Sequence, residues 1–343
     1  MTRYVALTLS ILLLPLMAAG GRRTPDRMLQ ATEAQRGWVA AIDQRRARLQ
    51  APDGARQSFR VRRGERWLSL SEFANGWIAA GVRLGKSGVD LSLVANFGHG
   101  ARRLRQPAQE ERSIRTRPTP IVSPSGLHGI AWLEGDSPTR LAVRAAAFEE
   151  GSFDAVATVS PAGVGGQAGL SAAVLADGSW LLVWSRFDGR DDEIFWSKRS
   201  PEGRWSRARR LAANNSVPDI TPWLLPHGDG ALVAWSRMTD EYEVVTARFA
   251  NGGWTSPRPL GGQGTLSPTF RRLRDRDLLL VRNAWPAAWT AFSFDQNGEP
   301  TEFAVVPEES GRPPVVRAGG GSSLAFEWPG RRARTPLLWE PVQ

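Results

Sequence analysis

Residues 180–205 read WLLVWSRFDGRDDEIFWSKRSPEGRW, and residues 232–254 read LVAWSRMTDEYEVVTARFANGGW. Each stretch has an apolar run with a tryptophan, a polar turn, a second apolar run, and a glycine turn that ends in tryptophan. Similar runs return along the chain, with anchor positions 51, 52, 51, 47 and 44 residues apart at Gly81, Trp132, Trp184, Trp235, Arg282 and Phe326. A period of about 40 to 50 residues with several short strands per unit predicts a β-propeller.

Each repeat extends on both sides of its anchor. A first apolar run lies at 67–73, 119–122, 169–175, 220–226, 267–273 and 313–317, and a third run lies at 89–97, 139–148, 192–199, 242–249, 288–294 and 333–339. Alternate positions in several of these runs are apolar, which is the period of a strand with one buried face. With a fourth, outer strand in each unit, the predicted fold class is all-β, a six-bladed β-propeller over residues 57–343.

The two ends of this repeat array complement each other. The last unit reaches the end of the given sequence after three runs, whereas an additional strand-like run, QSFRVRR, precedes the first unit at 57–63. Pairing these two elements would leave no open sheet edge at the junction. We therefore predict that the N-terminal strand supplies the outer strand of the sixth blade and closes the ring.

The residues before the propeller predict export and a short helix. Residues 1–20 have Arg3, an apolar stretch from Tyr4 to Met17 and small residues at 18–20, the pattern of a secretory signal peptide. The expected location is periplasmic or secreted, with no stable membrane span after the signal is cleaved. In the segment 21–56, Thr24-Pro25-Asp26 has the form of a helix start, and apolar residues follow at roughly helical spacing. A helix that packs on the propeller rim is the prediction, and a linker is the alternative.

The charge of the chain is a weak guide to its partners. There are 44 lysines and arginines against 34 acidic residues, and no cysteine. A basic exported protein is attracted to anionic polysaccharides or lipid head groups, whereas the export signal disfavours nucleic acid. The three histidines stand apart in the sequence, so no metal-ligand spacing is evident, and no cofactor is expected.

The repeats around 170–260 resemble those of the sialidase-like, Asp-box propellers. The turn of that family has the form Ser-x-Asp-x-Gly-x-x-Trp, and the nearest versions here are Ser200-Pro201-Glu202-Gly203-Arg204-Trp205 and Ala250-Asn251-Gly252-Gly253-Trp254. Both lack the Asp and have a shortened interval between Gly and Trp. In the family this box is a structural turn between the outer two strands, so the resemblance implies a fold and not an active site.

Candidate binding residues come from the loops between second and third strands and from the links between units, which share one face of a propeller. Polar groups that converge at a ring mouth suit a binding site, although solvated turns have the same composition. The candidates are Arg186, Asp188, Arg190, Asp192, Asp219, Arg237, Asp240, Glu241, Trp285 and Arg331, with Asp191, Glu193, Asn214 and Asn215 in the same segments.

Two functions from different classes follow. The first is an exported, non-catalytic propeller that binds a glycan, a peptide or a partner protein of the cell envelope. The alternative, implied by the resemblance, is a sialidase-like exo-glycoside hydrolase with Tyr242 as nucleophile and Arg186 and Arg237 in a clamp for the substrate carboxylate. The family's early Phe-Arg-Ile-Pro motif has its nearest match at Phe59-Arg60-Val61-Arg62, without the proline. A scaffold that docks through the N-terminal helix is a third prediction.

Overall fold

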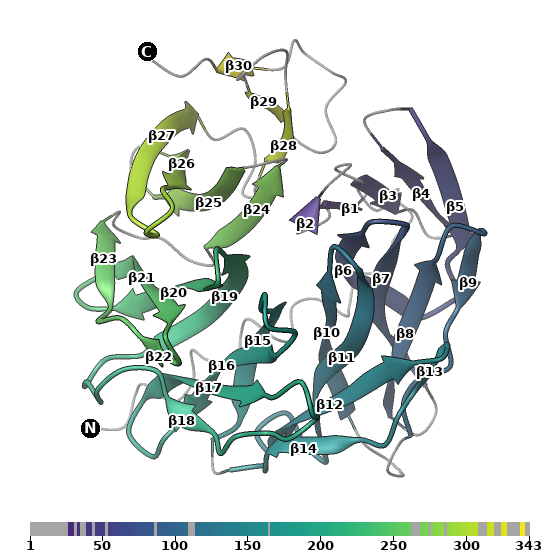
Figure 1. Cartoon of the computed structure of the whole chain (residues 1–343), viewed down its shortest axis with the longest axis horizontal. Coiled ribbons are helices and arrows are strands. Elements are labelled where there is room, and N and C mark those ends of the chain that lie inside the picture. Colours follow the sequence, from purple (N-terminus) through teal and green to yellow (C-terminus); the bar gives the residue numbers. More distant parts are fainter. Residues whose placement is uncertain are drawn as a thin grey trace, which may run out of the picture.

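The computed structural model describes residues 27–30, 33–34, 39–42, 45–51, 54–85, 88–108, 114–163, 165–261, 268–273, 276–284, 287–307, 314–318, 324–327 and 337–339. All regular structure in these ranges is β-strand. The sheets stand around a common centre like the blades of a propeller (Figure 1). Within the described part of the chain, no helix has the length and apolarity needed to cross a membrane.

The first sheets come from the N-terminal half. The N-terminal sheet has the order β1 (Arg27–Gln30), β3 (Val39–Ile42), β4 (Arg46–Gln50) and β5 (Arg56–Arg60). A nine-stranded sheet follows, made of two units that meet through a single parallel bridge between Ile114 and Val89. The first unit contains β6 (Glu65–Phe73), β7 (Gly76–Leu84), β8 (Val89–Asn96) and β9 (Ala101–Arg103), and the second contains β10 (Ile114–Ser123), β11 (Gly126–Gly135), β12 (Leu141–Glu149), β13 (Ser152–Phe153) and β14 (Ala157–Ser160).

Four further sheets complete the described fold. They contain β15 (Gln167–Val174), β16 (Trp180–Phe187), β17 (Asp192–Arg199) and β18 (Arg209–Arg210); then β19 (Asp219–His227), β20 (Gly230–Met238), β21 (Tyr242–Ala250), β22 (Gly253–Trp254) and β23 (Arg258–Gly261); then β24 (Thr269–Leu273), β25 (Arg276–Asn283), β26 (Ala288–Phe294) and β27 (Pro300–Pro307); and last β28 (Val315–Ala318), β29 (Leu324–Glu327) and β30 (Leu337–Trp339). The short strand β2 (Glu33–Ala34) pairs in parallel with β24. The N-terminal sheet, the two halves of the nine-stranded sheet and these four sheets make seven blade-like units in the described part of the chain.

The predicted repeat is confirmed at the level of its strands. All six anchors lie on second strands, namely β7, β11, β16, β20, β25 and β29. The described parts of the runs before and after them fall mainly on the first and third strands of the same units. Antiparallel pairing joins each first strand to its second and each second to its third, as in β15-β16-β17 and β19-β20-β21. The all-β fold and its propeller-like arrangement therefore follow from the sequence period.

Two predictions about the N-terminal region are wrong. Strands β1, β3 and β4 occupy the segment for which a helix was expected, and β4 alternates exposed and buried residues along its length. The strand expected to close the sixth blade, β5, pairs instead with β4, with Ala47 opposite Phe59. The segment therefore forms a sheet of its own, which adds a unit to the six that were predicted. The predicted signal peptide lies outside the described residues.

The repeated tryptophans form the cores between neighbouring units. Trp132, Trp184 and Trp235 are completely buried on β11, β16 and β20. One apolar cluster contains residues of the N-terminal sheet, such as Leu49, together with Trp77 of β7 and Trp289 of β26. The first and last thirds of the described chain therefore share a core, and inter-blade packing explains why tryptophan recurs in the sequence.

The innermost strands carry a repeated irregularity. The register between first and second strand shifts at Leu68 on β6, at Arg117-Pro118 on β10, at Gly169-Leu170 on β15 and at Thr221-Pro222 on β19. The last three have positive φ angles, 51° at Arg117, 60° at Gly169 and 53° at Thr221. A β-bulge of this kind bends a strand and redirects its side chains.

Hydroxyl groups just after the bulges tie neighbouring inner strands together. Ser69 Oγ donates to the Pro118 carbonyl at 3.3 Å, and Thr119 Oγ1 donates to the Leu170 carbonyl at 3.3 Å. The backbone N–H of Leu224 donates to Ser171 Oγ at 2.9 Å. These bonds link β6, β10, β15 and β19 in sequence around the centre (Figure 1).

Candidate functional site

The bulges of four inner strands enclose a central cavity of about 140 Å³. Because four neighbouring units contribute their innermost strands, the cavity lies toward the centre of the ring. Its walls come from β6, β10, β15 and β19, and the lining residues are Leu68, Ser69, Ser71, Arg117, Pro118, Thr119, Pro120, Val122, Leu170, Ser171, Ala172, Trp223 and Leu224.

Arg117 is the charged residue among those that line this cavity. The protein surrounds its guanidinium closely enough that burial lowers the pKa of the group, yet the residue keeps an exposed surface. Among the described residues, none forms an ion pair or a hydrogen bond with the guanidinium. Arg117 also has a positive φ of 51°, which is uncommon for a residue other than glycine, and it precedes a proline. An accessible guanidinium without a protein partner among the described residues, set beside hydroxyls and an indole ring, is a position where an anionic group can bind.

The rest of the lining is polar but carries no ionisable group suited to acid–base chemistry. Hydroxyls come from Ser69, Ser71, Thr119 and Ser171, and an aromatic surface comes from Trp223. No carboxylate, histidine or tyrosine is among the described residues that line the cavity. The arrangement can bind a small polar ligand, but its own walls supply no general acid or base.

A second polar group, the rim group, lies where the β15–β18 unit meets the β19–β23 unit. It contains Asp188, Asp191, Asp192, Glu193, Asn215, Asp219 and Arg237. The hairpin from β16 to β17 brings carboxylate oxygens of Asp188, Asp191 and Glu193 within 4.8 Å of one another. Asp188 accepts a backbone hydrogen bond from Arg190 at 2.9 Å and pairs with Arg210. Asp191 is 9% exposed, and its Oδ1 atom is buried without a hydrogen-bond partner.

The link between the two units connects this hairpin to the next sheet. The backbone N–H of Asn215 donates to Glu193 Oε1 at 3.0 Å, and Asn215 Nδ2 donates to Asp219 Oδ2 at 3.0 Å. Asp219 in turn receives two hydrogen bonds from Arg237, from Nε and Nη2, each at 2.8 Å. A fork of this kind holds both groups in a fixed geometry.

Burial, together with the charges of neighbouring carboxylates, raises the pKa of three rim carboxyls. Burial, reinforced by the charges of Asp219 and Asp191, raises the pKa of Glu193 to about 7. Burial and the neighbouring Asp191 raise the pKa of Asp192 to about 6. Burial and the charge of Asp188 also raise the pKa of Asp191. The rim therefore holds more negative charge than its own arginines neutralise.

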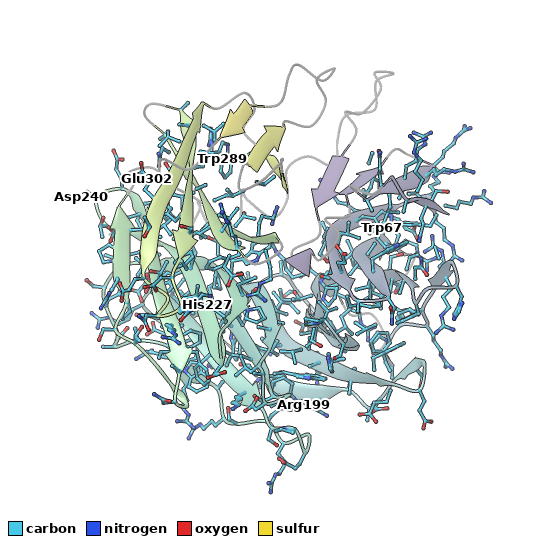
Figure 2. The ribbon with its side chains drawn as sticks, turned by 45° about the horizontal axis from the view of Figure 1, so that its top comes forward. Trp67, Arg199, His227, Asp240, Trp289 and Glu302 are labelled. Atoms are coloured by element: carbon cyan, nitrogen blue, oxygen red, sulfur yellow. The ribbon has the colours of Figure 1, made fainter. Side chains whose placement is uncertain are left out.

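The structure brings together some of the predicted site residues and separates others. Asp188, Asp219 and Arg237 belong to the rim group. Arg186 lies with its guanidinium 5.0 Å from the centre of the Phe195 ring. Arg190, Asp240 and Glu241 are exposed on hairpin tips, and Figure 2 shows Asp240 at the outer margin of the molecule. Trp285 and Arg331 lie outside the described residues.

Tyr242 begins β21, the third strand of its unit. Neighbouring strands in a sheet are about 4.8 Å apart, so Tyr242 lies roughly 10 Å outward from the inner strand β19. Burial and the charge of Asp192 raise the pKa of its hydroxyl. Tyr242 and Asp192 are therefore neighbours across the boundary between two units, away from the central cavity.

The sequence interpretation missed the central cavity. Its residues lie in the middle of apolar first strands, where loops were not expected. The available signal was the proline that follows Arg117 and Thr221 at matching places in two units, Arg117-Pro118 and Thr221-Pro222. Proline in a strand marks an edge or a bulge, and here it marks the bulges that open the cavity.

No family profile and no curated protein sequence matches the chain. Solved structures do resemble it. The polysaccharide lyase Uly1 has a TM-score of 0.55 at 9% identity, over 90% of this chain and 87% of the lyase chain. A puromycin-hydrolyzing peptidase of Mycobacterium tuberculosis has a TM-score of 0.53 at 14% identity, over 90% of this chain and 50% of the peptidase. The lectin of Aleuria aurantia, a six-bladed β-propeller, has a TM-score of 0.47 at 10% identity, over 84% of this chain and 98% of the lectin chain.

These similar structures identify the fold of the chain but not its function. The lyase and the peptidase support the β-propeller as the fold of this chain. The lectin is too distant to carry an argument, and identities this low do not transfer a ligand or a reaction. The resemblance to the sialidase-like, Asp-box propellers stays a prediction.

Proposed function

We propose that the chain is an exported, non-catalytic β-propeller module that binds a glycan, and that the ligand enters the central cavity. The observation that carries this proposal is Arg117, a cation surrounded by four inner strands beside hydroxyls and an indole ring. Sugar recognition uses these groups, since hydroxyls bond to sugar hydroxyls and an aromatic face packs against the ring. Arginine adds paired donors for a carboxylate or a sulfate.

The size and polarity of the cavity restrict the kind of ligand that can bind there. Typical sites for drug-sized ligands have volumes of about 300–1,000 Å³. A cavity of about 140 Å³ admits one residue or one terminal group of a larger glycan. Because Arg117 has no partner among the described residues, an acidic sugar gains a charge-assisted hydrogen bond there that a neutral sugar lacks. We expect an acidic terminal sugar to be preferred.

The alternative, a sialidase-like hydrolase, is less well supported by the geometry. Its reaction needs Tyr242 beside a carboxylate and facing the central channel, but Tyr242 lies on a third strand. The walls of the cavity also hold no carboxylate among the described residues, and glycoside hydrolysis ordinarily uses two. A binding module needs neither feature.

The test is calorimetric titration with methyl glucuronoside and methyl glucoside as a matched acidic and neutral pair. A charge-assisted hydrogen bond contributes about 1.5–3 kcal/mol, so Arg117→Gln should weaken binding of the acidic sugar by roughly 10- to 150-fold. The control is Arg207→Gln, which changes an exposed arginine remote from the lining. Absence of saturable binding for both sugars, or equal affinity in Arg117→Gln and wild type, would overturn the proposal.

Catalysis is tested on the same preparation with a fluorogenic sialoside and a panel of aryl glycosides. We expect no turnover. Turnover that disappears in Tyr242→Phe would identify the chain as an enzyme and would place the reaction on the rim.

A further inference from the structure

The rim group contains two carboxylates that the protein does not neutralise. Arg210 pairs with Asp188, and Arg237 makes a double hydrogen bond with Asp219. Neither Asp191 nor Glu193 has an ion-pair partner among the described residues. Glu193 is 2% exposed and accepts one backbone hydrogen bond, from Asn215.

Asp191 provides an observation separate from this charge count. Its side chain is nine-tenths buried, and Oδ1 has no hydrogen-bond partner. A buried carboxylate oxygen without a donor is costly, because it loses its hydration and gains nothing in return. Asp188, Asp191 and Glu193 each place one carboxylate oxygen within 4.8 Å of those of the other two, so the Asp191 side chain faces other acceptors. A bound cation would satisfy acceptors arranged in this way.

We propose that Asp188, Asp191 and Glu193 form a binding site for one calcium ion. Oxygen ligands select hard cations, and the set contains no histidine or cysteine, the ligands that favour zinc. Calcium binds oxygen at about 2.3–2.6 Å, so two opposed ligand atoms are about 4.6–5.2 Å apart. The group's mutual oxygen separations, all within 4.8 Å, fit that span. Magnesium keeps several of its waters and is usually bound through one or two carboxylates, so a set of three carboxylates favours calcium.

The site has a structural consequence for the boundary between two units. Glu193 holds the backbone of Asn215, and the Asn215 side chain holds Asp219 at the start of β19. An ion bound to Glu193 would therefore help to fix the position of the link between the β15–β18 and β19–β23 units. Bound calcium should stabilise this junction without involving the central cavity.

The experiment is titration of CaCl₂ into the chelator-treated full chain, followed by calorimetry, with a thermal melt at each calcium concentration. Extracellular calcium modules bind with a Kd of about 10⁻⁴–10⁻³ M, and we expect one ion per chain in that range or tighter. At a calcium concentration about 100 times the Kd, the melting temperature should rise. Magnesium at the same concentrations should bind at least tenfold more weakly.

Asp191→Asn is the diagnostic variant because it keeps the shape of the side chain and removes its charge. We expect its affinity for calcium to fall at least tenfold and its melting temperature to lose the calcium-dependent rise. The matched control is Asp240→Asn, an exposed carboxylate on the corresponding hairpin of the next unit, whose affinity should stay within twofold of wild type.

Two outcomes would overturn the site. One is a folded wild-type protein that shows no saturable calcium binding up to about 10 mM, a limit set about tenfold above the weakest expected Kd. The other is an Asp191→Asn variant that binds calcium as tightly as wild type. Arg117→Gln should leave calcium binding unchanged, so failure of the glycan proposal and failure of this one are distinguishable.

Discussion

Replacement of Glu134 by glutamine tests how the second propeller unit is held together. Glu134 on β11 lies directly across from Arg115 on β10, and both side chains are almost wholly enclosed. Arg115 Nε donates to Glu134 Oε1 at 3.1 Å, and its other nitrogens donate to the carbonyls of Pro107 and Ala108. Trp132 Nε1 donates to the second oxygen, Oε2, at 2.8 Å. Within the described part of the chain, this carboxylate is the negative charge that pairs with the fully buried guanidinium.

The expected loss is large because the substitution leaves that guanidinium charged and unpaired. Removal of one partner of a buried ion pair destabilises a protein by about 3–5 kcal/mol. Unfolding entropy is about 2.1 cal/mol/K per residue, or about 0.6 kcal/mol/K for roughly 300 folded residues, so the melting temperature should fall by about 5–8 °C. The amide has one oxygen, so it can accept from Trp132 Nε1 or from Arg115 Nε but not from both, and the loss combines the missing charge with one missing hydrogen bond.

The assay is thermal and urea unfolding of wild type, Glu134→Gln and the double variant Arg115→Met/Glu134→Leu. The double variant removes both charges together, and such apolar replacements are often neutral or stabilising. We therefore expect it to be more stable than the single variant. A Glu134→Gln protein within about 1 kcal/mol of wild type would refute the reasoning, because the pair would then contribute no more than an exposed one.

Three further predictions concern other parts of the fold. Gly169→Ala should destabilise the protein by about 2–4 kcal/mol in urea unfolding, because φ is +60° and a Cβ would meet Pro222 Cδ at 2.8 Å. The control is Gly178→Ala, where φ is +78° and no atom lies within 4 Å of the added Cβ, and it should lose only about 1–2 kcal/mol. Burial alone would raise the pKa of Asp277, but hydrogen bonds from His227 and Arg272 and the charge of Arg272 hold it below its usual range. This stabilisation is present above the unfolded pKa near 4 and disappears as pH falls through the folded pKa. Asp277→Asn should therefore lose less stability than wild type as the pH is lowered below about 4 in urea titrations. Trp132→Phe should destabilise the protein by about 1 kcal/mol more than Trp184→Phe, because Trp132 Nε1 donates to Glu134 whereas Trp184 Nε1 has no hydrogen-bond partner among the described residues. Equal melting temperatures for the two variants would contradict this predicted difference.

The strands were predictable because their signal is repeated. A single apolar run is ambiguous between strand and helix, but six runs at a common interval with glycine turns restrict the choice to one architecture. The N-terminal segment has no such support. Ala47 and Leu49 are buried on β4 while Arg46, Arg48 and Gln50 are exposed, a period of two that is only five residues long. This alternation is too short to identify a strand, and the apolar residues around it are spaced at roughly helical intervals, so the sequence predicts a helix there.

The location of the rim group could be predicted in part from the sequence, because the topology of a propeller determines which loops share a face. Loops between second and third strands and links between units lie on one face of a propeller, so the sequence period alone places Glu193 and Asn215 on the same face. The roles of the individual residues were not accessible. Which carboxylate takes an arginine and which remains unpaired depends on side-chain directions that spacing does not encode, as the contrast between Asp188 and Asp191 shows.

The repeated bulge links the stability of the ring to its capacity to bind. A regular inner strand, which is the edge strand of its unit, pairs with the second strand along its whole length. The bulges at Arg117, Gly169 and Thr221 interrupt that pairing, and the hydroxyls that follow, Thr119 and Ser171, recover hydrogen bonds from the neighbouring unit. The same displacement turns Arg117 toward the centre. A substitution that regularises a bulge should therefore weaken contact between units and close the cavity together, so stability and ligand binding cannot be optimised separately at these positions.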